Sequence, residues 1–361
     1  MSNRYLAGFI TASYNPLLVP NAPTIGTATA GDATASAVFT APSNVGGSAI
    51  TGYRAIATPG GATNTGTSSP ITVSGLSNGT AYTLQVFATN AYGPSPLSAA
   101  SNSVTPVLSY MEYLIVAGGG GGSGGGGGAG GMLTGSTIFS GSYTVTIGAG
   151  GNSATQTTGN ATSGSNSLIT GYTAIGGGYG AGTTNVGGSG GSGGGASVGT
   201  TSSAQVVVGG TATSGQGNNG GTSTNTGVYT GWLGAGGGGA GAVGGNVADY
   251  DTGLSGGGVG GAGLASSITG TSVTYGAGGR GYLSIGVTSD AAANSGGGGG
   301  GSRTVQAASQ GWNGGSGIVV IAYPNTYPAI SSIGGGLTYN QPTRSGFRVY
   351  VFTAGTGTIT F

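Results

Sequence analysis

The chain has 361 residues, of which 90 are glycine, and its only charged side chains are six arginines and five acidic residues. Histidine, cysteine and lysine are absent, which excludes catalytic triads, Cys/His zinc centres, Schiff-base lysines and P-loops. We therefore expect no enzyme, no cofactor and no metal. The net charge of +1 excludes the basic surface of a nucleic-acid-binding protein, and no apolar stretch is long enough for membrane insertion.

The distribution of glycine divides the chain. Only 12 of the 90 glycines lie in residues 1–110. We interpret residues 1–19 as an N-terminal arm, 20–107 as a first domain, 108–110 as a linker and 111–361 as a glycine-rich domain. Glycine inside a helix costs about 1 kcal/mol, and the residues between the glycines show no helical period, so we expect an all-β protein.

The first domain alternates short β-prone runs, from TIGTATA to SAASNSVTP, with turn residues at the spacing of a small sandwich. Its segment SPITVSGLSNGTAYTLQVFATN resembles the second half of a fibronectin type III domain, with Leu76 and Tyr82 at the positions of the tyrosine corner. This resemblance implies a fibronectin III-like β-sandwich. The side chains expected in its core are Phe39, Tyr53, Ile56, Leu84 and Val86.

Apolar strands are predicted at both ends of the glycine-rich domain. Tyr113–Ala117 (YLIVA) precedes the first long glycine run, and Gly317–Pro324 (GIVVIAYP) follows the last one, so we expect these two strands to pair and close the domain. The alternating segment SGSYTVTIGAGG predicts a further strand through Tyr143. The segment RVYVFTAGTGTITF predicts a hairpin with Gly355 and Gly357 in its turn.

The glycine runs between these strands have no side chains to bury, so their cohesion must come from backbone hydrogen bonds. Polyproline-II-like strands have three residues per turn, and glycine lets such strands pack closely enough to bond to one another. We predict polyglycine-II-like strands for the runs Gly118–Gly122, Gly124–Gly128, Gly236–Gly239 and Gly296–Gly301. The alternative is a flexible glycine-serine linker, for which the interspersed Tyr, Ile, Val and Trp residues would be unnecessary.

Aromatic residues among glycines and small polar residues are the candidates for binding, because rigid rings can stack on sugar faces or apolar receptor surfaces with little entropy loss. These candidates are Tyr229, Trp232, Tyr250, Tyr275, Tyr282 and Trp312. The alternative for each ring is that it fills a gap beside glycine. Asp249 and Asp251 cluster as well, but the further oxygen ligands of a calcium site are missing, and we interpret the pair as a polar loop tip.

Residues 111–361 resemble the glycine-rich domains of bacteriophage tail fibres and tail-tip adhesins in the pattern YLIVAGGGGG, YTVTIGAGG, repeated GGxGG clusters and a closing IVVIAYP. The resemblance implies a virion structural protein on a tail appendage or the particle surface. It also implies homo-oligomers and binding of a host cell-surface glycan or protein. The arm would dock onto other virion proteins, with Arg4, Tyr5, Phe9 and Ile10 as candidate contacts.

Two other functions fit the same sequence. One is a purely architectural virion component, such as a capsid decoration or a fibre shaft. The other is a bacterial extracellular surface or filament protein. Neither requires a receptor of its own.

Overall fold

The computed structural model describes residues 18–107, 110–138, 141–155, 157, 159–183, 185–199, 203–227, 232–248, 257–281, 290–302, 310–325 and 327–361. The chain forms two compact units, Met1–Ser109 and Tyr110–Phe361. The described residues form strands and loops without α-helix, as the glycine content predicts. Accordingly, the part of the chain described contains no helix that could cross a membrane.

The first unit is a sandwich of two sheets, one with strand order β1-β2-β5 and the other with order β4-β3-β6-β7. The strands are β1 (Thr24–Gly31), β2 (Thr34–Thr40), β3 (Gly52–Thr58), β4 (Thr63–Gly66), β5 (Ile71–Ser74), β6 (Thr83–Asn90) and β7 (Gly93–Pro94). Their inward-facing side chains, among them Phe39, Leu84 and Val86, form one apolar core.

Two sequence predictions for this core have different outcomes. The tyrosine corner is present, since the Tyr82 hydroxyl accepts a hydrogen bond from the backbone N–H of Ser77 at 3.1 Å and Leu76 is buried beside it. Ile56, however, was wrongly predicted to be a core residue. Ala55 and Ala57 point inward on β3, so the strand's two-residue period places Ile56 on the outer face.

The segment after β7 pairs with β6 without forming a regular strand, although SAASNSVTP predicts one. Serines at every third position, Ser95, Ser98 and Ser101, use both backbone and side chain for this pairing. Each donates its backbone N–H to a β6 carbonyl, and each hydroxyl accepts from the N–H of that same β6 residue. The β6 partners are Ala88, Val86 and Leu84.

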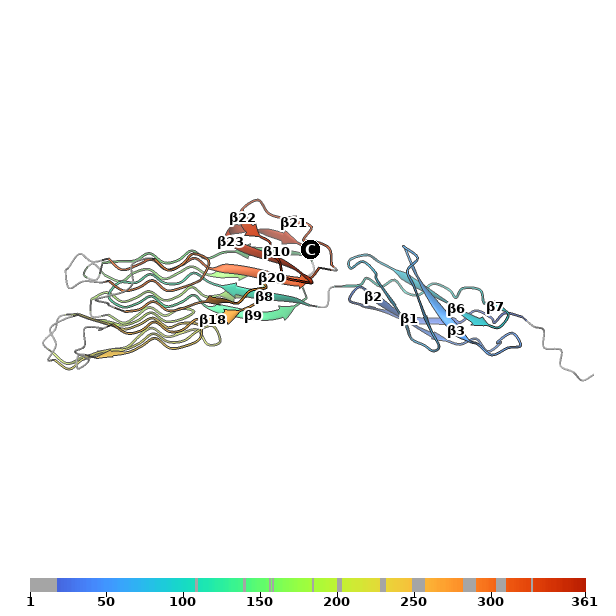
Figure 1. Cartoon of the computed structure of the whole chain (residues 1–361), viewed down its shortest axis with the longest axis horizontal. Helices are drawn as coiled ribbons and strands as arrows, with labels where there is room; N and C mark the ends of the chain where they lie inside the picture. The colour runs from blue at the N-terminus through green and yellow to red at the C-terminus, as the bar shows by residue number, and fades with distance from the viewer. Residues whose placement is uncertain are drawn as a thin grey trace, which may run out of the picture. The chain divides into compact units, whose positions relative to one another are not determined.

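The second unit is built on a sheet with the path β12-β11-β10-β23-β20-β8-β9 (Figure 1). Its strands are β8 (Met111–Val116), β9 (Met132–Thr137), β10 (Ser142–Thr146), β11 (Ser167–Ile169), β12 (Tyr172–Ala174), β20 (Ile318–Pro324) and β23 (Phe347–Thr360). Strands β8 and β20 pair antiparallel, which confirms that the two apolar segments flanking the glycine runs close the domain.

The predicted hairpin at the C-terminus is wrong. Strand β23 continues through Gly355 and Gly357, and its first half pairs with β20 while its second half pairs with β10. One strand thus changes partners near Gly355, which has a φ of 93°, where the glycines suggested a hairpin turn. Two shorter strands, β21 (Ser332–Ile333) and β22 (Leu337–Asn340), also pair with β23.

Between β8 and β20 lie glycine-rich segments that run alongside one another as wavy traces in Figure 1. We call these segments, between Ala117 and Gly317, the glycine lattice. Very short strands interrupt it: β13 (Ser197–Val198), β14 (Gln205–Val207), β15 (Ser223–Asn225), β16 (Leu233–Gly234), β17 (Val247–Ala248), β18 (Leu264–Ser266) and β19 (Val273–Tyr275).

Hydrogen bonds in the lattice repeat every three residues. In the run that follows β8, the donor and acceptor residues are Gly118 to Ser165, Gly121 to Thr162, Gly119 to Gly315, Gly122 to Trp312 and Gly120 to Gly128. Residues three apart therefore bond to the same neighbouring segment, and successive residues bond to different ones. This is the geometry of a three-residue turn without internal hydrogen bonds, and the segments are polyglycine-II-like, as predicted.

The second run, residues 125–131, follows the same rule around three neighbours. Its donors and acceptors are Gly125 to Ala181, Gly128 to Gly178 and Gly131 to Ile175, then Gly126 to Ala235 and Ala129 to Gly238, then Gly127 to Gly299 and Gly130 to Gly296. Every N–H of this run is used, so the run is an interior element of the lattice.

This packing excludes all but small side chains, such as that of Ala129, from the interior, and at most interior positions it excludes even a Cβ atom. A Cβ atom on Gly119, Gly125 or Gly237 would overlap a carbonyl oxygen of a neighbouring segment. On the outer segments, where one side lacks a neighbour, residues three apart are exposed instead. These exposed pairs include Val208 and Thr211, Val243 and Asn246, and Val259 and Ala262.

Substitution of Gly237 by Ala is expected to destabilise the second unit by about 3 kcal/mol or more, because the new methyl group would overlap the carbonyl oxygen of Gly127. Gly335→Ala is the matched control, since a Cβ at Gly335 meets open space. Differential scanning calorimetry of the full chain measures both. Equal unfolding temperatures for the two variants would contradict the packing described.

Buried tyrosines predict a pH limit for the second unit. Burial, followed by the hydrogen bond with Tyr350, raises the pKa of Tyr323 well above its usual value, and burial also raises the pKa of Tyr275 and Tyr113. Ionisation therefore costs more in the folded than in the unfolded state. The stabilisation from the neutral phenols is complete below about pH 10 and is lost as the pH rises above it.

We expect the unfolding temperature of the second unit to fall above about pH 10. The unfolding temperature of Tyr323→Phe should fall less steeply with pH, because one ionising group is gone. The variant also loses the hydrogen bond that the Tyr323 hydroxyl donates to the Pro328 carbonyl, which lowers its unfolding temperature by the same amount at every pH. Calorimetry between pH 7 and 11 tests this. Parallel curves for the two proteins would show that Tyr323 does not govern the loss.

Candidate binding end of the glycine lattice

The lattice has two ends with different chemistry. The proximal end joins the sheet and packs on an apolar cluster that includes Leu114, Val116, Met132 and Ile318. The distal end is reached when the run that leaves β8 comes to the bend at Ser123–Gly125. A second, smaller apolar cluster lies there, formed by Val198, Leu233, Ala235 and Val247, and neither tryptophan belongs to it.

Trp312 lies at the distal end. Its carbonyl oxygen accepts a hydrogen bond from Gly122, directly before the bend, and its N–H donates to Gly300, both at 2.9 Å. Its side chain is partly exposed. The two backbone bonds fix the chain on both sides of this residue while leaving the ring accessible.

A polar network fixes the segment next to Trp312. The Asp290 carboxylate accepts two hydrogen bonds from Asn313, one from the backbone N–H at 2.8 Å and one from the side-chain amide at 3.2 Å. The Asn313 amide oxygen in turn accepts from the backbone N–H of Ser153 at 2.7 Å, and Gln310 donates to the Ser153 hydroxyl. Three separate chain segments are thereby joined around the tryptophan.

Trp232 lies at the same end. It directly precedes β16, which pairs with β13. The carbonyl of Ala235, the residue after β16, accepts a hydrogen bond from the N–H of Gly126, just beyond the bend. The Trp232 side chain is also partly exposed. The register thus places both tryptophans of the protein on distal segments of the lattice.

Two lattice segments lie between the tryptophans, one with Gly300 and Gly301 and one with Arg280 and Gly281. The N–H of Trp312 donates to Gly300, and the N–H of Gly301 donates to the carbonyl of Arg280. A Cβ at Gly281 would in turn meet the carbonyl of Gly234, two residues after Trp232. Arg280 is exposed. A cation therefore lies on a segment between those that carry the two rings, an arrangement suited to a ligand with apolar faces and a polar or anionic group.

The other predicted binding residues are not gathered here. Tyr275 is 4% exposed and packs with Leu114 and Ile318 in the proximal cluster, so its ring is a core element and is removed from the binding candidates. Its place in the alternating segment SVTY was a signal for such a core position. The other candidates lie outside the described residues: Tyr229, Tyr250, Tyr282, the pair Asp249 and Asp251, and the arm residues Arg4, Tyr5, Phe9 and Ile10.

Sequence reasoning missed Asp290, Asn313 and Arg280 at this end. Asn313 follows Trp312 directly, which was a usable signal, but the pairing of Asn313 with Asp290 depends on the lattice register. Within the described ranges no group of three acidic, histidine or cysteine side chains could hold a metal ion. What this end offers chemically is contact by rings, amides and hydroxyls.

Comparison with known families matches both units. The fibronectin type III domain matches residues 21–104, and the glycine-rich domain matches residues 95–324, more than half of the chain. The first unit is therefore a fibronectin type III domain. No curated protein matches the chain significantly.

Some solved structures are similar to about a quarter of the chain. The crystal structure of domains A168–A170 from titin has 25% identity over 24% of this chain and 32% of that chain, with a TM-score of 0.22. Titin kinase with its flanking domains has 25% identity over 25% and 17%, with a TM-score of 0.22. The twitchin kinase region from C. elegans has 22% identity over 24% and 17%, with a TM-score of 0.23. The chain spans less than a third of these proteins, and at these scores the similarity carries no functional argument.

The network around Asn313 predicts how firmly Trp312 is held. In a Trp232→Phe background, the tryptophan fluorescence comes from Trp312 alone. Asp290→Ala removes the acceptor of two hydrogen bonds, each of which contributes about 1 kcal/mol, and should raise the acrylamide quenching constant about twofold. Asp32→Ala, in the other unit, should leave it unchanged. Equal quenching in all three proteins would mean that Asp290 does not order the tryptophan.

Proposed function

The chain belongs to the glycine-rich domain family, and from this premise we propose that it is a structural protein of a bacteriophage particle that binds a host cell. In this proposal it is a tail fibre or tail-tip adhesin. The fibronectin type III domain acts as a spacer, and the N-terminal arm docks onto other virion proteins. The distal end of the glycine lattice contacts a glycan or protein of the cell surface without chemical conversion.

The observation that carries the proposal is the position of Trp232 and Trp312 at one end of a lattice that excludes side chains from its interior. A ring that only filled a gap would be expected in an apolar core, as Tyr275 is. The two tryptophans instead stay partly exposed on segments fixed by backbone hydrogen bonds. Rigid aromatic anchors of this kind lose little entropy on binding and are typical of recognition surfaces.

Weak contacts suffice in such a role. A particle carries several copies of its fibres, and simultaneous contacts raise the overall affinity without any new interaction in one copy. The near absence of charge fits the same setting, because the protein does not depend on ion pairs that salt would screen.

A purely architectural role is favoured by a different observation. Val208, Val243 and Val259 are 55%, 64% and 59% exposed on outer segments of the lattice. Backbone bonds from Gly220 to Gly210, Gly244 to Asn219 and Gly245 to Val259 connect these segments in sequence. Together they give one side of the lattice an uncharged, partly apolar surface, which suits lateral contact between copies in a homo-oligomer.

Binding of the fluorescently labelled full chain to a panel of bacterial strains tests the adhesin role. On the strain bound most strongly, Trp312→Ala and Trp232→Ala should each weaken binding about tenfold or more, since each removes an anchor. Tyr92→Ala is the control, because this ring is 46% exposed in the other unit. The unfolding temperatures of all variants are measured alongside.

Binding that neither tryptophan variant weakens, or no binding to any strain, would overturn the adhesin role. In that case the oligomeric state of the full chain is measured by sedimentation over a range of concentrations. Assembly that increases with concentration, and that the double variant Val208→Ser/Val259→Ser abolishes, supports the architectural role.

A further inference from the structure

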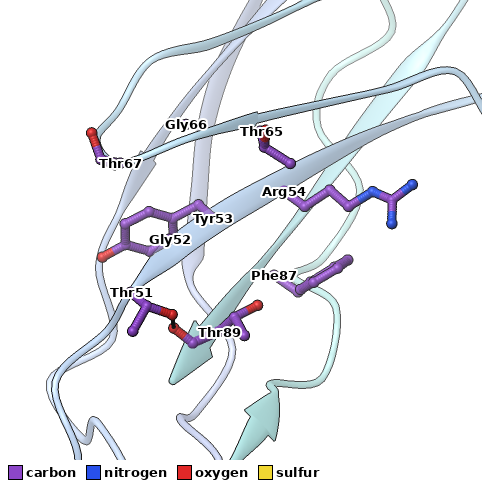
Figure 2. Close-up of a pocket in the computed structure, with 9 residues that line it drawn as sticks. All are labelled: Thr51, Gly52, Tyr53, Arg54, Thr65, Gly66, Thr67, Phe87 and Thr89. Atoms are coloured by element: carbon purple, nitrogen blue, oxygen red, sulfur yellow. Dashed lines mark hydrogen bonds between the residues drawn. The ribbon is translucent and has the colours of Figure 1, made fainter. Parts of the chain in front are cut away.

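The first unit has a hollow on the outer face of the sheet β4-β3-β6, with a volume of about 410 Å³ (Figure 2). It is lined by Thr51, Gly52, Tyr53, Arg54, Thr65, Gly66, Thr67, Phe87 and Thr89. A Cβ on Gly52 would meet nothing closer than 3.6 Å, so this part of the hollow is free of side chains. Its volume falls within the range of small-molecule sites, about 300–1,000 Å³.

The register of the strands sets the chemistry of this face. Arg54 on β3 lies opposite Thr65 on β4 and opposite Phe87 on β6, and Figure 2 shows the three side chains in one row across the sheet. A cation therefore has a hydroxyl on one side and an aromatic ring on the other. Thr51 and Thr67 border the same hollow.

Arg54 is a cation that has no counter-ion among the residues that the structure describes. Its Nη2 donates to the Thr63 hydroxyl at 3.0 Å, and its side chain is exposed. The one ion pair within the described ranges joins Arg344 to Glu112 in the other unit. A guanidinium carries five N–H donors in a planar fork that matches a carboxylate, so most of the fork at Arg54 remains for a ligand.

Phe87 faces outward from a strand whose neighbouring residues Val86 and Ala88 are fully buried in the core. It is partly exposed, and in the described part of the chain no other ring packs against it. Tyr53, at the other side of the hollow in Figure 2, packs against Phe39 in a tilted arrangement with ring centroids 4.7 Å apart and is held by the core. Phe87 is therefore the ring whose face is left for a ligand.

We propose that this hollow is a second ligand site, which takes a sugar unit bearing a carboxylate. The C–H face of the sugar ring packs on Phe87, and its hydroxyls form hydrogen bonds with the threonines. The two oxygens of its carboxylate accept hydrogen bonds from the guanidinium N–H groups of Arg54. A single cation matches one carboxylate, whereas a nucleic-acid backbone would need several cations. The site lies in the fibronectin type III domain and does not depend on the function proposed for the lattice.

The test uses the full chain and trigalacturonic acid, with its methyl ester as the uncharged counterpart, in isothermal titration calorimetry. The acid should bind and the ester should bind about tenfold more weakly or not at all. Arg54→Gln should weaken binding of the acid about tenfold, to the level of the ester, because the charge-assisted bonds are lost. Arg54→Lys should restore only part of it, since lysine lacks the planar fork.

Variants of the ring separate binding from folding. Phe87→Leu keeps an apolar side chain but removes the flat face, and it should weaken binding with an unchanged unfolding temperature, as should Phe87→Ala if that variant stays folded. Tyr92→Ala, outside the hollow, should bind as the original protein does. Equal affinity for acid and ester, unchanged affinity in Arg54→Gln, or no binding of the acid would overturn the proposal.

Discussion

The glycine lattice depends on one constraint: where a backbone with three residues per turn hydrogen-bonds to neighbours on every side, most positions have no room for a Cβ atom. At Gly119 and Gly237 the added atom would overlap a carbonyl oxygen of the adjacent segment. The cohesion that side chains provide in an ordinary core is provided here by backbone hydrogen bonds. A chain with 90 glycines and few charged residues is the composition that this packing requires.

Excluding side chains from the interior moves them to the ends and flanks of the lattice. Apolar residues gather at the proximal end, where β8 and β20 pair and Tyr275 and Ile318 pack with Leu114. The tryptophans remain at the distal end, and Val208, Val243 and Val259 are exposed on outer segments of the lattice. Because the interior accommodates only small side chains such as those of Ala129 and Ser192, larger side chains lie at the ends and on the flank, which is where both proposed roles of the second unit are located.

The sequence was informative wherever a local pattern decides the structure. The two-residue alternation of the flanking strands predicted the pairing of β8 with β20, and the spacing of Leu76 and Tyr82 predicted the tyrosine corner. It failed where partners distant in the chain decide. Gly355 and Gly357 resemble a hairpin turn, but β23 continues through them because it pairs first with β20 and then with β10. The contact of Asp290 with Asn313 likewise depends on a lattice register that no local pattern encodes.

A period of three residues also appears in the fibronectin type III domain, where it solves a different problem. Ser95, Ser98 and Ser101 each bond to β6 through backbone and hydroxyl alike. On this segment a side chain at every third position provides the acceptor that a regular strand would supply from its backbone. In the interior of the lattice, neighbouring backbones occupy every side, and most positions are glycine. The number of neighbouring segments thus decides which residue occupies every third position: serine where one strand lies alongside, and glycine where backbones surround the segment.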